Sequence, residues 1–218
     1  MQTPLVDING HLEFSLYHGT SSIFIESIRK HGLGASRPKD IFDINILNSL
    51  ANELSDKHPD VEWWQANSFI IENMLPQRVT NAGLNFRYGG TYFSPSRCTA
   101  ENYAKSNVFG SELISMIFNA HKSLHDADPC TAERIIPKNH PLHELFKKTH
   151  QPIILRTKYI KASSLRTEQG EPVEQQLENM IQWRDEYPPD EIEEVWQQFN
   201  FELIGKLNDE EFEIEWLK

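Results

Sequence analysis

Near its start the chain reads LYHGT (Leu16–Thr20), and this stretch decides the fold that we expect. Apolar and polar residues alternate loosely over residues 12–18, which is typical of a core strand. A helix is predicted directly after it, because the apolar residues of 23–33 recur at helical spacing and glycines follow at Gly32 and Gly34. The start of the chain therefore predicts a strand, a turn and a helix that ends at glycine.

A second cluster reads GTYF (Gly90–Phe93) and predicts another strand. A polar turn at Ser94–Ser96 follows, and a helix from Thr99 to Lys105 carries Tyr103. Further along, residues 152–160 read PIILRTKYI and predict a central strand, because aliphatic and β-branched residues favour a buried sheet. Strands are thus expected at residues 12–18, 90–93 and 152–160.

Helices are expected between these strands. Apolar residues at helical spacing predict a helical insertion over about 38–87, whereas the prolines of 121–150 indicate a loop-rich stretch. An apolar run at 113–118 continues toward His121, and the other expected elements are helices at 177–183 and 192–199 and strands at 199–207 and 212–216. This arrangement predicts a single α+β domain over residues 1–218.

Length and composition favour one well-packed domain. The chain has 218 residues, of which 39% are hydrophobic, and no apolar run approaches the roughly 18 residues that a membrane span needs. Residues 1–10 lack the basic start and apolar core of a secretion signal. Cys98 and Cys130 are too few for a disulfide framework, which favours a reducing compartment. We therefore expect a cytoplasmic protein with no membrane partner.

Charge is unevenly distributed along the chain. Residues 166–218 contain 16 acidic and 4 basic side chains, a net charge of −12, whereas the whole chain has a net charge of −11. An acidic surface repels nucleic acid, because binding to phosphates depends on cationic side chains. The acidic part at 166–218 is instead a candidate surface for a basic protein or an antitoxin.

The joint order of these motifs carries a resemblance to a known family. A His-Gly-Thr strand, a helix, Gly-Leu, Gly-x-Tyr-Phe and Ala-x-Asn-Tyr occur in succession. In this order the chain resembles the ADP-ribosyltransferase fold, in the branch of poly-ADP-ribose polymerases and diphtheria toxin, whose members carry His, Tyr and usually Glu on three strands. The resemblance implies split antiparallel β-sheets around an NAD cleft, with helical insertions. It also implies NAD as co-substrate and no metal.

The resemblance assigns roles to the first cluster. His18 would hydrogen-bond a ribose hydroxyl, the backbone of Gly19 would hold the nicotinamide carboxamide, and Thr20 would support the turn. In related enzymes a loop between the two motif strands covers the dinucleotide, so the insertion at 38–87 would be a lid. A packing insertion without a role in binding is the alternative.

The second cluster would supply the ring contacts. By resemblance, Tyr92 is catalytic and stacks on the nicotinamide opposite Tyr103, with Phe93 among the cofactor-binding residues; an electron-poor pyridinium ring packs well on phenol faces. One position departs from the family. A serine often precedes the second tyrosine by three residues, and here that position is Ala100, beside Thr99. Unless Thr99 substitutes, NAD should bind more weakly.

The third catalytic position has three candidates. Gln198, Asn200 and Glu202 share one face of a predicted strand, because residues two apart point the same way. Glu202 alone can supply the negative charge that stabilises a ribosyl cation, so we predict Glu202 as the catalytic carboxylate. Asn200 or Gln198 at the family position would imply transfer of single ADP-ribose units or lost activity. Glu174 is a more distant candidate.

Other combinations of residues are less specific. His121 and His125 are four residues apart, and His140 and His143 are near in sequence, but no cysteine pair or acidic ligand completes a zinc set. We therefore predict no metal site. Cys98 lacks an orienting base in the sequence and is not expected to be a nucleophile.

Taken together, the resemblance implies an NAD-dependent mono-ADP-ribosyltransferase that modifies a macromolecule, either protein or nucleic acid, as a toxin or defence effector. Two alternatives remain open at this point. One is an RNA 2′-phosphotransferase-like enzyme of the same fold, which would need several arginines around a phosphate. The other is a catalytically inactive module that retains the NAD pocket.

Overall fold

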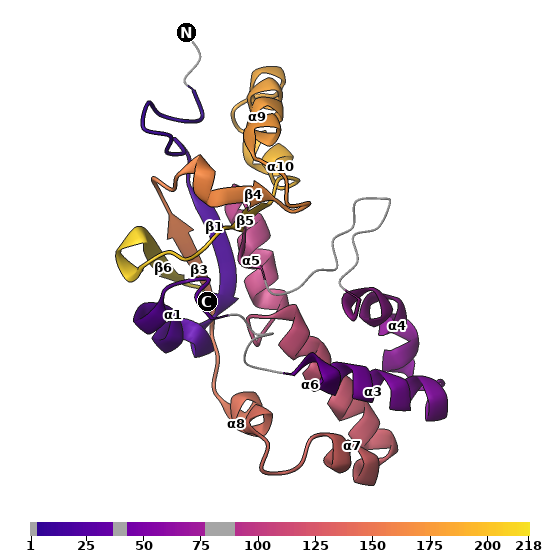
Figure 1. Cartoon of the computed structure of the whole chain (residues 1–218). Helices are drawn as coiled ribbons and strands as arrows, with labels where there is room; N and C mark the ends of the chain where they lie inside the picture. The colour runs from indigo at the N-terminus through magenta and orange to yellow at the C-terminus, as the bar shows by residue number, and fades with distance from the viewer. Residues whose placement is uncertain (1–3, 37–42, 77–89) are drawn as a thin grey trace. The chain divides into compact units, whose positions relative to one another are not determined.

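The structure is a computed structural model that describes residues 4–36, 43–76 and 90–218 (Figure 1). The chain divides into two compact units. Unit 1 consists of Met1–Ser36, Gly90–Gly110 and Gln151–Lys218, and unit 2 consists of Arg37–Gly89 and Ser111–His150. Each unit is therefore assembled from segments that are not contiguous in sequence, and each is described separately below.

The first sheet of unit 1 has three antiparallel strands in the order β1-β3-β6 (Figure 1). They are β1 (Leu16–Ser21), β3 (Pro152–Thr157) and β6 (Phe212–Trp216). The predicted central strand is confirmed, since β3 lies between the other two and Ile153, Ile154 and Leu155 are fully buried. His18 of β1 lies opposite Leu155.

The second sheet has the order β2-β5-β4 and is also antiparallel. Its strands are β2 (Tyr92–Phe93), β5 (Phe201–Leu203) and β4 (Leu165–Thr167). One isolated bridge joins this sheet to the first. The amide of Tyr17 donates to the Ser94 carbonyl at 2.8 Å, and the amide of Ser94 donates to the Tyr17 carbonyl at 2.9 Å. The start of β1 and the end of β2 are thereby held together.

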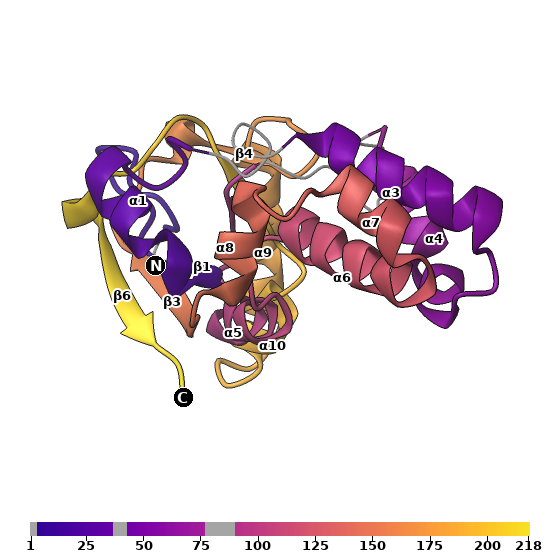
Figure 2. The ribbon, with the colours of Figure 1, turned by 90° about the horizontal axis from the view of Figure 1, so that it is seen from below.

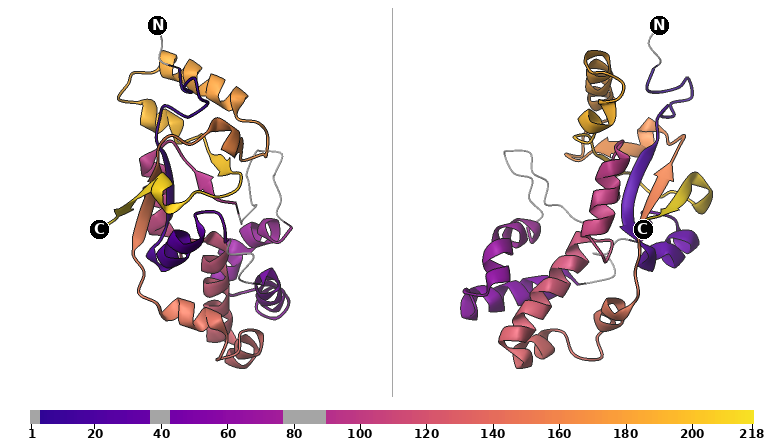
Figure 3. Two further views of the ribbon diagram at one scale, coloured as in Figure 1. Left: turned by 60° about the vertical axis from the view of Figure 1, so that its left-hand side comes forward. Right: turned by 180° about the vertical axis from the view of Figure 1, so that it is seen from behind.

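Helices and short 3-10 turns complete unit 1. They are α1 (Ile25–His31), α5 (Arg97–Ser106), α9 (Glu174–Glu186), α10 (Ile192–Trp196), η1 (Ser22–Phe24), η2 (Ala162–Ser164) and η3 (Asp209–Glu211). Helix α5 packs along β1 and β3, as the right-hand view of Figure 3 shows. Its buried residues on this side are the small Ala100 and Ala104, which pack with Ile154 and Leu217. Small side chains allow a helix to approach a sheet closely.

Unit 2 is helical in the residues described. It contains α3 (Ile44–Lys57), α4 (Glu62–Met74), α6 (Glu112–Ala127), α7 (Pro129–Ile135) and α8 (Pro141–Lys147). Helix α6 packs against α3, α4 and α7 (Figure 2). Helices α3 and α4 lie where the sequence predicts an insertion, and the ends of that insertion, 38–42 and 77–87, lie outside the described residues.

The expectation of a loop-rich stretch at 121–150 was wrong. Helix α6 continues to Ala127, and α7 and α8 follow. The prolines that suggested loops, Pro129 and Pro141, lie in the first turn of these helices. A proline is tolerated there, because a first-turn amide has no helical acceptor to lose. Asp128 completes the start of α7 by accepting a hydrogen bond from the amide of Thr131.

The predicted α+β class is confirmed by the two small antiparallel sheets and the many helices. The core of unit 1 gathers apolar side chains from both sheets, including Leu16, Phe93, Leu155 and Phe201. Within the described ranges, none of the helices combines the length and apolar composition needed to cross a lipid bilayer.

Candidate functional site

His18 lies in β1 with its ring turned toward β2. Its Nδ1 lies 2.8 Å from the backbone carbonyl of Tyr92. A carbonyl can only accept, so Nδ1 carries the proton and Nε2 of the neutral ring is an acceptor. Burial lowers the pKa of His18, and the hydrogen bond to Tyr92 opposes this shift. The ring is therefore held in one tautomer, with an acceptor nitrogen available.

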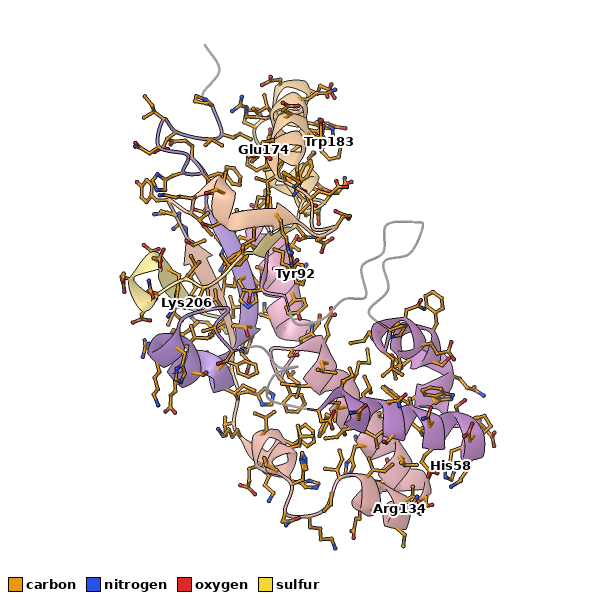
Figure 4. The ribbon with its side chains drawn as sticks, in the orientation of Figure 1. His58, Tyr92, Arg134, Glu174, Trp183 and Lys206 are labelled. Atoms are coloured by element: carbon orange, nitrogen blue, oxygen red, sulfur yellow. The ribbon has the colours of Figure 1, made fainter. Side chains whose placement is uncertain are left out.

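Tyr92, Glu202 and Arg166 form a row across the second sheet. Tyr92 of β2 pairs with Glu202 of β5, and Glu202 pairs with Arg166 of β4. Residues directly opposite each other in an antiparallel sheet point to the same face. Glu202 is only 4% exposed, although it is acidic. Figure 4 labels Tyr92 on its strand.

Arg166 binds both oxygens of the Glu202 carboxylate. Its Nε donates to Oε2 at 2.8 Å and its Nη2 donates to Oε1 at 2.7 Å. These hydrogen bonds raise the pKa of Arg166. Electrostatic interactions with Glu202 and with Tyr92 raise this pKa further. Two parallel bonds between a planar guanidinium and a carboxylate fix the orientation of both groups. The pair therefore fixes the position of the Glu202 carboxylate in the middle of the row.

Gly90 lies against the same row. A Cβ at this position would lie 2.7 Å from Cζ of Tyr92 and 2.9 Å from Oε1 of Glu202. Real Cβ atoms do not approach other atoms so closely, so any other residue at position 90 would displace the Tyr92 ring or the Glu202 carboxylate. The sequence motif Gly-x-Tyr thus has a steric basis in this structure.

Gly19 has a comparable role between β1 and α5. A Cβ there would overlap the carbonyl oxygen of Ala100 and would lie 3.0 Å from the amide nitrogen of Ala104. Close packing of the helix on the strand is thus one reason for glycine at this position. Tyr103 belongs to the same helix. Its predicted stacking opposite Tyr92, and the predicted contact of the Gly19 backbone with nicotinamide, stay predictions.

Two other predicted residues have structural roles. The Thr20 hydroxyl donates to the carbonyl of Gly110 at 3.3 Å, which ties the end of β1 to a turn. Phe93 is 1% exposed and belongs to the core of unit 1, with its ring centroid 5.8 Å from that of His18. Neighbouring residues of a strand point to opposite faces, so Phe93 does not share the face of Tyr92. Phe93 supports the site from the core side.

Among the candidate carboxylates and amides, Glu202 alone lies in the row with Tyr92. Asn200 precedes β5 and uses its carbonyl to accept a hydrogen bond from Gln176 at 3.0 Å. Gln198 is exposed, and Glu174 is an exposed residue at the start of α9 (Figure 4). The geometry thus distinguishes Glu202 from the alternatives.

Several histidines of unit 2 lie near one another. The ring centroids of His121 and His143 are 5.5 Å apart, and those of His121 and His125 are 6.1 Å apart. His140 uses Nδ1 to accept from the amide of Leu142. Within the described ranges, no three His, Cys, Asp or Glu side chains are arranged to hold a metal ion.

Arg166 is the residue of this site that the sequence analysis did not single out. It lies in a strand of three residues, which is too short to give a recognisable periodicity. A positive charge opposite Glu202 becomes apparent only when the register of β4 and β5 is known.

Comparisons with protein-family models, with curated proteins and with solved structures found no significant match for this chain.

Proposed function

We propose that this chain is an NAD-dependent mono-ADP-ribosyltransferase that modifies a macromolecule. The observation that carries the proposal is the direct connection of three residues from distant parts of the chain. His18 donates to the backbone of Tyr92, and Tyr92 pairs with Glu202 in the neighbouring strand. These three residues are the ones to which the resemblance assigns the family's His, Tyr and Glu.

The reaction exchanges one bond at C1′ of the nicotinamide ribose. The bond from C1′ to the nicotinamide nitrogen breaks, and nicotinamide leaves with the electron pair. A bond from C1′ to an acceptor atom forms, and the acceptor loses a proton. Positive charge develops on the ribose between these events, so a fixed negative charge nearby lowers the barrier.

Each residue of the site has a physical role in this reaction. Neutral His18 would accept a hydrogen bond from a ribose hydroxyl through Nε2, because Nδ1 already donates to Tyr92. The Tyr92 ring would stack on the nicotinamide. Glu202 would accept from the ribose 2′-hydroxyl and stabilise the developing cation. The absence of a side chain at Gly90 keeps the Tyr92 ring and the Glu202 carboxylate in this arrangement.

Purified protein and NAD labelled in the adenylate part test the proposal. We expect release of nicotinamide and transfer of the label to a component of a cell lysate. Glu202→Gln should lower the rate by at least about 100-fold, as expected when an electrostatic group of the transition state is lost. Glu178→Gln is the matched control, because it makes the same change at an exposed position. Separate protease and nuclease treatment then identifies the acceptor as protein or nucleic acid.

The outcome also separates the alternatives for the third residue. Activity that persists in Glu202→Gln and is lost in Asn200→Ala would move the catalytic role to Asn200. If the unmodified protein releases no nicotinamide from NAD, whichever lysate is added, an enzymatic role is contradicted.

A catalytically inactive NAD-binding module is the second candidate, and one observation favours it. Arg166 already engages both oxygens of Glu202 and offsets its charge. In that case NAD would raise the melting temperature of the protein without being consumed, because a ligand that binds only the folded state stabilises it. The acidic part at 166–218 would then be the surface for a basic partner.

A further inference from the structure

We propose that Arg166 is a positioning residue for the Glu202 carboxylate and that its two hydrogen bonds hold this group ready for ADP-ribose transfer. This inference rests on the proposed function. It concerns a residue that neither the motifs nor the family resemblance identified.

The geometry of the row supports this role. Glu202 lies between Tyr92 on one side and Arg166 on the other, in the middle strand of the sheet. The Arg166 fork contacts one oxygen with Nε and the other with Nη2. A glutamate side chain has three rotatable bonds, and a fork with two parallel bonds restricts the last of them. The carboxylate is therefore held in a single orientation beside the Tyr92 ring.

The Glu202 carboxylate keeps acceptor capacity beside the ion pair. An ionised carboxylate has about four lone-pair sites on its two oxygens. Arg166 uses one site on each oxygen. Sites for a substrate hydroxyl remain on both oxygens, so the ion pair and the predicted hydrogen bond from ribose are compatible.

Glu202 and Arg166 differ in their exposure to water. The Glu202 side chain is 5% exposed, whereas the Arg166 side chain is 40% exposed. Water screens the charge of the arginine more than that of the glutamate. A buried carboxylate without a partner is costly to keep charged. Arg166 therefore supplies the partner that a carboxylate as buried as Glu202 requires.

The experiment compares Arg166→Gln and Arg166→Lys with the unmodified protein in NAD turnover. Arg156→Gln is the matched control, because Arg156 also lies on a strand of unit 1 and pairs with a carboxylate, that of the exposed Glu213. We expect Arg166→Gln to lower kcat by about 10- to 100-fold, the effect of misplacing a catalytic group. The KM for NAD should change by less than about threefold, because the lost interaction acts in the transition state.

The lysine variant separates positioning from charge alone. Lysine keeps the positive charge but lacks the planar fork, so we expect Arg166→Lys to recover only part of kcat. If the melting curve of Arg166→Gln shows that it does not fold, Arg166→Lys takes its place. A kcat of Arg166→Lys equal to that of the unmodified protein would then overturn the inference.

The possible failures are distinguishable. Absence of NAD turnover in the unmodified protein overturns the proposed function. If the unmodified protein turns over NAD and the kcat of Arg166→Gln is unchanged, this inference alone is overturned. A raised kcat would overturn it as well, because Arg166 would then hold Glu202 back from the reaction. An equal loss of kcat in Arg156→Gln would also overturn it, since the effect would not be specific to the row.

Discussion

Gly19 allows α5 to approach β1 more closely than any side chain permits. A Cβ at this position would overlap the backbone of Ala100, and backbone atoms cannot move aside as a flexible side chain can. We expect Gly19→Ala to lower the free energy of unfolding by about 1 to 3 kcal/mol or more, the usual cost of overpacking. Urea denaturation followed by circular dichroism measures this change.

Gly10→Ala provides the comparison for this variant. Gly10 has a positive φ of 82°, and no atom lies within 4 Å of the place that a Cβ would take, so alanine there meets backbone strain and no steric overlap. Its expected cost is about 1 kcal/mol. A Gly19→Ala variant as stable as the unmodified protein would show that α5 does not pack on β1 as described.

His18 makes the protein sensitive to acid. Burial lowers its pKa below the ordinary value near 6.5, so the unfolded chain takes up the proton first as pH falls. The contribution of neutral His18 to stability is therefore complete at higher pH and is lost below about pH 6.5. We expect NAD turnover to decline at lower pH still, where the folded protein takes up this proton, because a protonated Nε2 no longer accepts from ribose.

Stability measured from about pH 8 to about pH 5 tests this expectation against His18→Asn, which lacks the titrating ring. The variant should lose part of the pH dependence. If the free energy of unfolding of the unmodified protein instead rises toward pH 5, the expected loss of stability through a buried neutral His18 is contradicted.

Two residues of the site illustrate what the sequence can reveal. The location of Glu202 on a strand was predictable, because apolar and polar residues alternate over 199–207, whereas its catalytic role stays a prediction. Arg166 was not predictable, because its three-residue strand has no periodicity of its own and its partner follows from the register of two strands. Interactions within a segment leave a pattern in sequence, whereas pairings between segments do not.

At the scale of elements, prolines gave a misleading signal. Pro129 and Pro141 suggested loops, yet both lie in the first turn of a helix, α7 and α8 respectively. A proline stops a helix only in its interior, where an amide donor is lost and the ring clashes with the preceding turn. Helix α5 was predicted from Thr99 but starts at Arg97, because the Ser96 hydroxyl accepts from the amide of Thr99.

Helix α6 should also respond to acid through His121. Burial lowers the pKa of His121, and the neighbouring His143 and His125 lower it further, while Glu133 opposes them. Its Nε2 is buried without a hydrogen-bond partner among the described residues. Protonation therefore costs more in the folded state than in the unfolded chain, so this contribution to stability is lost as pH falls below about 6.5.

Replacing His121 with leucine removes the titrating group and keeps an apolar side chain on α6. We expect His121→Leu to reduce the loss of amide protection in α6 between neutral and mildly acidic pH, as measured by hydrogen exchange. Lys122→Leu is the control, because it places a leucine at an exposed position of the same helix. Equal pH dependence in His121→Leu and the unmodified protein would exclude His121 as the source.

At the scale of the whole molecule, both units combine segments that the chain separates. Unit 1 takes β1 from the start, β2 from the middle, and β3 to β6 from the last third. The α+β class was predictable, because it follows from the types of elements and their order. The division into two units was not, since residues 111–150 join the helices of 43–76 through packing of α6 on α3 and α4 and of α7 on α3, which leaves no pattern in the sequence.

Each unit buries its own apolar residues, so a cavity in one should loosen that unit first. Leu50 of α3 and Leu155 of β3 are both fully buried. Replacing either with alanine should cost about 2 to 5 kcal/mol, because contacts are lost and a cavity remains. Hydrogen exchange should show loss of amide protection in α3 and α6 for Leu50→Ala, and in β1 and β3 for Leu155→Ala. Equal loss in all four elements for both variants would instead mean that the two units unfold as one cooperative body.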